Sequence, residues 1–362
     1  MTLKLLDVGD NPRDGGLSHG RAFPREIRDN VATYLARFAH AGMAREESIR
    51  RGADWLPRLR AFDPDYVLEM EGIAEGADVP LAEIALLSVR YELSYLAFGR
   101  EDGTLKTDGC TAFAALPEVT RSGEMWIGQN WDWLARVRGR CFVLRAKRKN
   151  KPGFVCLTQA GIPGGMTGLN EAGIGVCVNG LTTPEDGRDP DGLPHHLRVR
   201  AILSARTFTE ALKPVMGTRH VGSTHFLIAH AGGEALGLEA SPSRINALNP
   251  EDGLYTHSNH FVGPTAGAGF ERKHPSTLFR AKRLERKIRQ GNKPLDLALA
   301  RDLLSDHFSH PNSICAHPDP EISDVERTTT VASVVLALDR RTLYASDGPP
   351  CESPYEAYPL AA

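Results

Sequence analysis

The chain changes from helical to strand-like patterning near residue 110, and this change constrains the fold more than any other feature. Before it, residues 25–40, 66–78 and 80–96 carry apolar side chains three or four positions apart, as helices do, and Pro80 suits a first helical turn. After it, short apolar runs alternate with turn residues. Strands grouped between helical blocks predict an α+β protein of antiparallel sheets covered by helices, rather than a doubly wound parallel sheet.

Hairpins link many of the expected strands. In each of them two apolar runs flank a short polar turn: 111–119 with 125–133, 165–170 with 174–181, and 328–338 with 342–346. Further strands are expected at 225–230, 234–240 and 254–261, and helical stretches at 195–216 and 276–308. We expect the last residues, 347–362, to form an extended tail.

The charge balance argues against several partners. Lys plus Arg is 43 and Asp plus Glu is 45, for a net charge of −2, so neither nucleic acid nor an acidic membrane is expected as a partner. The first residues meet Gly and charged side chains before any apolar run long enough for a signal peptide, and no stretch approaches the roughly 20 apolar residues of a membrane helix. A cytoplasmic protein is therefore expected.

Six widely scattered cysteines form no C-x-x-C pair, so neither disulfides nor a zinc site is expected from their spacing. Cys156 and Cys177 lie inside apolar runs and are interpreted as core residues. Cys110 differs, because it follows Asp-Gly at the edge of a strand. A thiol with a pKa of about 8.5 needs a base for catalysis, and the nearest His after it is His195.

Cleavage of the Gly109–Cys110 bond would supply that base. Cys110 would become an N-terminal residue whose α-amine, with a pKa of about 7.7–8.0, can take the proton of its own thiol. Gly109 suits such a site, because the carbonyl under attack is free of crowding by a β-carbon.

Motifs along the chain support this interpretation. TDGCTAF surrounds Cys110, MEGIAEGADVPLAEIALLSVRYELSY precedes it, and GQNWDW, GLNEAGIGVCVNGL, GLEASP, YTHSNHF and NSICAH follow. In this order they resemble the isopenicillin N acyltransferase (acyl-CoA:6-aminopenicillanic acid acyltransferase) family of N-terminal-nucleophile hydrolases. The resemblance implies a four-layer αββα sandwich of two antiparallel sheets between helical layers. It also implies self-cleavage into residues 1–109, a helical α segment, and residues 110–362, a β segment, which together form one composite domain.

The resemblance also assigns the site residues. Cys110 falls on the nucleophile, Asp132 on the acidic partner of the α-amine, Asn259 on the oxyanion-hole Asn and Arg327 on an Arg near the nucleophile. Asn179 lies where related hydrolases keep another Asn, although a turn residue before Gly180 is an equal alternative.

Two departures from the family pattern affect these assignments. Glu326 stands where a family member has Ser, and Ala112 where it has Thr. Glu326 would be able to neutralise Arg327, which puts the family's substrate contacts in doubt but leaves the nucleophile intact.

Other clusters have simpler interpretations. His257 and His260, and His307 and His310, are each separated by two residues, and His195 is followed by His196, but neighbouring carboxylates or cysteines at zinc-like spacing are missing. The basic segment 136–151 would be able to steer a CoA phosphate or form a solvated hairpin tip, and residues 280–290 are interpreted as the charged outer face of a helix.

Three functions are compatible with this sequence. The first is a self-processing cysteine enzyme that moves an acyl group from an amide or thioester to an amine or to water, with amide hydrolysis alone as its narrower form. The others are a metal hydrolase that uses the histidine clusters and an inactive binding protein. The first is favoured, with an acyl amide or acyl-CoA as substrate, no cofactor or metal, and the α and β segments as partners of each other.

Overall fold

A computed structural model describes residues 2–98, 109–188, 190–265, 267, 269–291 and 293–361. Residues 106–108 of the motif at Cys110 lie outside these ranges. Among the described residues, no helix is both long enough and apolar enough to cross a membrane.

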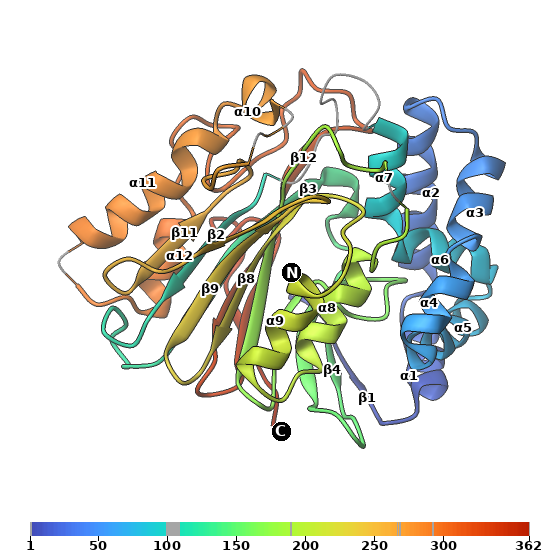
Figure 1. The fold of residues 1–362 in the computed structure, drawn as a ribbon, viewed down its shortest axis with the longest axis horizontal. Helices are drawn as coiled ribbons and strands as arrows, with labels where there is room; N and C mark the ends of the chain where they lie inside the picture. Colours follow the sequence, from blue (N-terminus) through green and yellow to red (C-terminus); the bar gives the residue numbers. More distant parts are fainter. Residues whose placement is uncertain are drawn as a thin grey trace.

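The first third of the chain forms one layer of helices (Figure 1). These are α1 (Pro12–Ala22), α2 (Pro24–His40), α3 (Arg45–Ala53), α4 (Leu56–Phe62), α5 (Pro64–Ala77), α6 (Leu81–Ser88) and α7 (Arg90–Phe98). Local signals set their starts: Asp63 accepts hydrogen bonds from the backbone N–H groups of Asp65 and Tyr66, and Pro64 occupies the first helical position of α5. The single helix expected at 80–96 is divided at Val89.

Helices α1 and α5 touch through their backbones. Gly16 and Gly20 of α1 lie against Gly72 and Gly76 of α5, and a β-carbon added at any of these four positions would lie 2.1–2.5 Å from a backbone oxygen of the other helix. Glycine is therefore required by the spacing of the two helices, because a methyl group has no room there.

The larger sheet has eight strands in the order β1-β4-β5-β6-β7-β8-β9-β10. Their bounds are β1 (Leu5–Val8), β4 (Cys141–Ala146), β5 (Phe154–Gln159), β6 (Thr167–Asn170), β7 (Ile174–Gly180), β8 (Thr224–His230), β9 (Glu234–Ala240) and β10 (Ile245–Leu248). All neighbours are antiparallel except β1 and β4, which run parallel. The unexpected strand β1 ties the N-terminal part of the chain into this sheet.

The smaller sheet has six antiparallel strands in the order β11-β2-β3-β12-β13-β14. Their bounds are β2 (Thr111–Ala115), β3 (Trp126–Leu134), β11 (Leu254–His257), β12 (Thr328–Ala337), β13 (Thr342–Asp347) and β14 (Glu356–Pro359). The expected hairpins β2–β3, β6–β7 and β12–β13 are confirmed. The expected tail is wrong in part, because residues 356–359 add strand β14 to the sheet edge.

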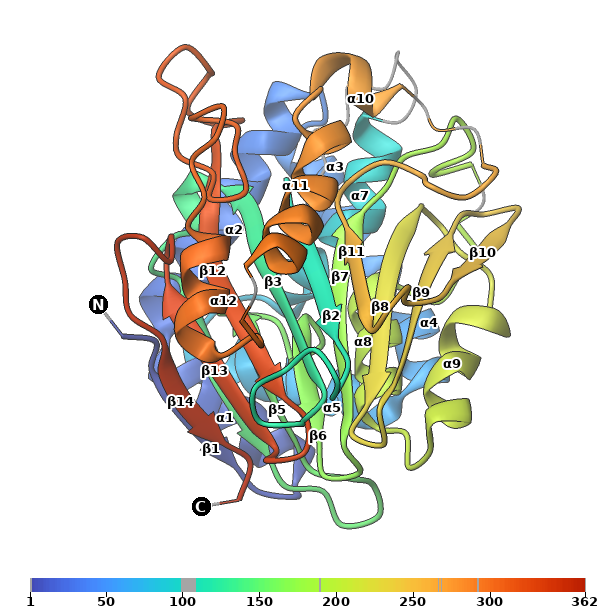
Figure 2. The ribbon, with the colours of Figure 1, turned by 90° about the vertical axis from the view of Figure 1, so that its left-hand side faces the viewer.

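Helices cover the outer faces of both sheets (Figures 1 and 2). On the larger sheet α8 (His195–Leu203) and α9 (Phe208–Met216) pack beside the N-terminal helices. On the smaller sheet lie α11 (Thr277–Gln290) and α12 (Leu297–Leu304), which share a separate core with β2, β3 and β12, and α10 (Phe270–Lys273) precedes them. The predicted order of layers, helices–sheet–sheet–helices, is confirmed, and the main core fills the space between the sheets and under the N-terminal helices.

Candidate active site

Cys110 lies immediately before β2 and is fully buried. Its Sγ lies 3.9 Å from the backbone oxygen of Asp132 on the neighbouring strand β3. The next residue, Thr111, is bound by a side chain from α11 on the outer side of the sheet. Because side chains alternate along a strand, the thiol points to the other side, into the core between the two sheets.

Asp132 packs against Gly109 from near the C-terminal end of β3. It is 1% exposed, and its Oδ1 accepts a hydrogen bond of 2.6 Å from Thr330 Oγ1, its cross-strand partner on β12. A β-carbon at position 109 would lie 3.0 Å from Asp132 Oδ2. The register of β12 shifts directly after Thr330, a bulge of the kind that directs side chains at functional sites. The carboxylate is thus held beside the peptide that precedes Cys110.

Arg280 reaches the same peptide from α11. It donates hydrogen bonds to the carbonyl oxygens of both Gly109 and Cys110, and to Thr111 Oγ1 at 2.6 Å. Its side chain is 2% exposed. Burial lowers the pKa of Arg280, and the nearby Asp132 and Cys110 act in the opposite direction. A buried cation is therefore aimed at the carbonyl that self-cleavage would attack.

The expectation that residues 280–290 form a charged outer face is wrong for Arg280. It shares the buried face of α11 with Ala281, Leu284 and Ile288. Its position four residues before Leu284 and eight before Ile288 was the signal available in the sequence, because helical residues at these spacings lie on one face.

Asn259 joins Arg280 to the larger sheet. Its Oδ1 accepts a hydrogen bond of 2.9 Å from Arg280, its Nδ2 donates to Gly180 O at 3.0 Å, and its backbone N–H donates to Thr277 Oγ1. Asn259 is 1% exposed. Cys110, Asp132 and Asn259 are therefore brought together by the structure, with Arg280 as the link.

Asn179 lies one residue before Gly180, at the end of β7, and is fully buried. Its Oδ1 is 2.8 Å from Nδ1 of His225, whose Nε2 lies 2.9 Å from the Tyr255 hydroxyl of the opposite sheet. Asn179 Nδ2 has no hydrogen-bond partner among the described residues. A buried amide donor without an acceptor is rare, and it is consistent with a donor kept for a ligand or an intermediate.

His257 is engaged elsewhere. Its Nε2 lies 2.9 Å from Glu239 Oε1 and its Nδ1 lies 2.7 Å from Ser258 O. Glu239 also accepts from the backbone N–H groups of Val262 and Gly263. The pair of His257 and Glu239 therefore holds the loop that carries Asn259, and both ring nitrogens face acceptors of that loop and sheet.

Arg327 is not brought to this group. Its guanidinium donates to the backbone oxygens of Pro320 and Ile322, and Asp324 lies 4.0 Å away. Its neighbour Glu326 lies 3.7 Å from His40. In the part of the chain that the structure describes, Arg280 takes the place next to the nucleophile that Arg327 was expected to take.

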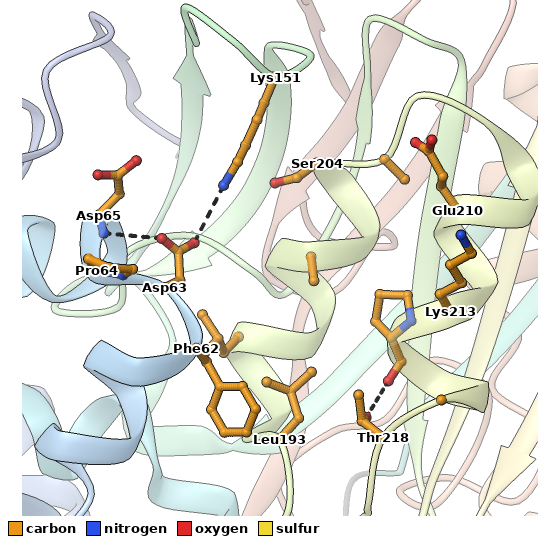
Figure 3. Close-up of a pocket in the computed structure, with 15 residues that line it drawn as sticks. Phe62, Asp63, Pro64, Asp65, Lys151, Leu193, Ser204, Glu210, Lys213 and Thr218 are labelled. Carbon is orange, nitrogen blue, oxygen red and sulfur yellow. Dashed lines mark hydrogen bonds and ion pairs between the residues drawn. The ribbon is translucent and has the colours of Figure 1, made fainter.

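A cavity of about 370 Å³ opens onto the Gly109 side of this group. Asp132 and Arg280 line it together with Ser276, Phe279 and residues of the loop before β12. A larger cavity, of about 950 Å³, lies between the start of α5 and helices α8 and α9 (Figure 3). None of the predicted site residues lines that cavity, and its Asp63 caps α5 and faces Lys151 at 3.9 Å, so the smaller cavity is the candidate substrate site.

The basic segment 136–151 supplies few free cations. Its five arginines form ion pairs with acidic residues of other segments: Arg136 with Asp324, Arg138 with Glu352, Arg140 with Asp29, Arg145 with Asp7, and Arg148 with Glu69. These pairs connect the segment to the rest of the molecule.

Comparisons with known proteins match the sequence of this chain to a family. The family described as acyl-coenzyme A:6-aminopenicillanic acid acyl-transferase matches residues 119–349. The acyl-coenzyme A:6-aminopenicillanic-acid-acyltransferase 40 kDa form of Emericella nidulans is 30% identical over 267 residues, which cover 70% of this chain and 69% of that protein.

Two solved structures superpose on part of this chain. The N-acylethanolamine-hydrolyzing acid amidase ortholog of Caenorhabditis elegans superposes with a TM-score of 0.47 at 15% identity, over 64% of this chain and 93% of that chain. The penicillin V acylase of Agrobacterium tumefaciens superposes with a TM-score of 0.45 at 13% identity, over 66% and 82% of the two chains.

Proposed function

The chain belongs to the acyl-coenzyme A:6-aminopenicillanic acid acyl-transferase family, and on this premise we propose that it is an N-terminal-nucleophile enzyme, which cleaves itself between Gly109 and Cys110 and then transfers acyl groups through Cys110. One observation carries the proposal. Three buried groups converge on a single peptide bond: the thiol of Cys110, the carboxylate of Asp132 and the guanidinium of Arg280.

Self-cleavage begins when Cys110 Sγ attacks the carbonyl carbon of Gly109. A carbon–sulfur bond forms and negative charge develops on the Gly109 oxygen, to which Arg280 already donates a hydrogen bond. The carbon–nitrogen bond then breaks, and the nitrogen leaves as the α-amine of Cys110 after taking up the thiol proton. Water hydrolyses the resulting thioester, which frees the Gly109 carboxyl group and the thiol.

The processed enzyme repeats this attack on a substrate. The α-amine of Cys110 accepts the thiol proton, and Asp132 stabilises the ammonium form that results. The substrate carbonyl takes the place of the Gly109 carbonyl, because the same thiol attacks both. Asn259 and Asn179 are the proposed amide donors to the oxyanion, and Asn179 Nδ2 has no other acceptor among the described residues.

The acyl group is then passed from Cys110 to an amine or to water. The name of the Emericella nidulans relative supports an acyl-CoA as donor and a penicillin nucleus as acceptor for this chain as candidates. The processed enzyme should be assayed with acyl-CoA, penicillins and N-acyl amino acids, each with and without an amine acceptor. Amide product in the presence of the amine indicates transfer, and free acid alone indicates hydrolysis.

The decisive experiment follows the fate of the bond itself. Wild-type protein should run as two fragments on a denaturing gel, with the larger one beginning at Cys110. Cys110→Ala should remain one inactive chain, and Cys110→Ser should cleave slowly, because an alcohol is much less ionised than a thiol. Cys156→Ala, which alters a buried cysteine of β5, is the matched control and should cleave like wild type. Two fragments from Cys110→Ala would refute the self-cleavage.

A further inference from the structure

Four side chains converge on one point beside the loop that walls the candidate substrate cavity. His307, Cys315 and His317 come from the loop between α12 and β12, and Cys351 from the turn between β13 and β14. One ligand atom from each of them, a ring nitrogen or a sulfur, lies within 4.8 Å of all the others. Spacing along the chain does not predict this cluster, because Cys351 is 36 residues from Cys315.

Four of the six separations between these atoms are close to those of a tetrahedral metal site. The Nε2 atoms of His307 and His317 are 3.0 Å apart, the two sulfur atoms 3.5 Å apart, and His317 Nε2 lies 3.7 and 3.5 Å from Cys315 and Cys351. With Zn–N bonds of about 2.0–2.1 Å and Zn–S bonds of about 2.3 Å, a regular tetrahedron places its ligand atoms roughly 3.3–3.8 Å apart. We propose that His307, Cys315, His317 and Cys351 bind one zinc ion.

The donor set indicates which metal it is. Two thiolates and two imidazoles in a tetrahedron favour zinc over the hard cations, which prefer oxygen ligands. Four protein ligands leave no position open for water, so the ion has a structural role rather than a catalytic one. On binding, the two thiols lose their protons.

A second layer of contacts supports the ligands. Glu352 Oε1 lies 3.4 Å from Nδ1 of His317, the ring nitrogen that faces away from the cluster, and Arg138 donates to the other oxygen of Glu352 at 2.5 Å. A carboxylate on the outer nitrogen of a metal-bound imidazole fixes the ring and its tautomer. Cys315 is buried and His307 is exposed, so the ion has a path from solvent.

The position of the ion explains what it does. His317 lines the cavity next to Asp132, and Ala316, which follows Cys315, receives a hydrogen bond from Thr330 N and donates one to Thr330 Oγ1. Thr330 in turn donates to Asp132. The zinc ion therefore fixes the loop that forms one wall of the cavity. Through Cys351 it joins this loop to the turn between β13 and β14, at the edge of the smaller sheet.

A disulfide between Cys315 and Cys351 is the competing arrangement, because their sulfur atoms are close enough for a small shift to join them. A disulfide would consume both thiols, and His307 and His317 would then have no metal ion to bind at the centre of the cluster. Zinc content and the mass of the unreduced protein separate the two cases, and neither depends on enzymatic activity.

The full-length chain should be purified under reducing conditions with a tag that binds no metal, and its zinc measured by elemental analysis. We expect about one zinc per chain, and at least a fivefold loss in each of the single variants Cys315→Ser and Cys351→Ser. His310→Gln is the matched control: its ring lies 5.3 Å from that of His317 but outside the four ligands, so it should retain the zinc.

A second measurement protects the test against variants that fold poorly. Wild-type chain refilled with Co²⁺ after chelation should show the intense visible and near-ultraviolet absorption of tetrahedral, thiolate-bound cobalt. Wild-type protein that takes up neither zinc nor cobalt while reduced would overturn the proposal. So would zinc retained in both cysteine variants, or a wild-type mass lower by two hydrogens, which indicates the disulfide.

Discussion

Arg280 concentrates several roles in one side chain, because it binds both carbonyls of the cleavage site and the amide of Asn259. Arg280→Lys should slow self-cleavage by roughly 10²–10³-fold, since a lysine cannot donate in a fork to several acceptors and the loss of one oxyanion donor has effects of this size. The cleaved fraction on a denaturing gel over time measures the effect. Arg327→Lys should change the rate by less than about threefold, because its contacts lie on the loop 320–324. The opposite ranking would show that the family position, Arg327, is the functional one.

The position of Asp132 beside the cleavage site leads to a prediction about the pH dependence of activity. In processed enzyme, activity requires the neutral α-amine of Cys110, so the rate should rise with pH through one pKa near the ordinary amine value of about 7.7–8.0. The Asp132 anion stabilises the ammonium form, so Asp132→Asn should shift this limb to lower pH and reduce kcat. The profile of kcat/KM against pH is the measurement, with Asp302→Asn on the exposed side of α12 as control. If the rise of kcat/KM with pH occurs at the same pKa in Asp132→Asn as in wild type, Asp132 does not interact with the α-amine.

At the scale of single residues, the sequence predicted the site residues that lie in recognisable motifs. It missed the site residues that only the folded structure brings close to Cys110. Cys110, Asp132 and Asn259 lie in short motifs, each on a β-strand or close to one end of it, and the structure joins them. Arg280 and Thr330 reach the group from α11 and β12, far away along the chain. No spacing rule connects such positions, because the distance between them is set by the packing of a helix on a sheet.

Among the elements, the contact between α1 and α5 is the least tolerant of change. Gly20→Ala would place a methyl group 2.4 Å from Ile73 O, so the helices must separate. We expect a loss of about 2–4 kcal/mol in the free energy of unfolding, measured by urea denaturation. Gly15→Ala, in the same helix, meets only Val8 Cβ at 3.3 Å and gains helix propensity, so it should change stability by less than about 1 kcal/mol. Equal losses in the two variants would mean that the close approach does not matter.

Helices and strands were predicted well where the periodicity of apolar residues is strong. They were predicted poorly where contacts with distant parts of the chain determine the local structure. The buried hairpins alternate clearly and were found. The edge strands β1 and β14 were missed, since four residues carry too little pattern, and β1 in addition pairs with β4, which is distant along the chain. The helix break at Val89 was missed for a similar reason: an apolar run predicts one helix even where the chain forms two.

For the whole molecule, the proposed cleavage should leave the two segments together. Strand β1 pairs with β4, the Tyr34 hydroxyl binds Trp133 and Gln159, and the buried carboxylate of Glu69 binds Arg200. The two side-chain contacts are buried, and none of the three depends on the peptide bond at residue 109. Processed protein should therefore show two fragments on a denaturing gel but one particle of full mass by light scattering, even after dilution. Separation of the fragments without denaturant would refute the composite domain.

The two ends of the described chain are also neighbours: the Tyr358 hydroxyl donates to Leu3 O at 2.8 Å, and Figure 2 places both ends on the same side of the molecule. A short linker would be able to join them, and the chain could then be opened at the bond before Cys110. Such a circular permutant would start at Cys110 and end at Gly109, with every strand still able to find its partner. Once its initiator methionine is removed, it would carry the free α-amine from synthesis, so that maturation and catalysis, which share one thiol in the natural order, would become separate properties.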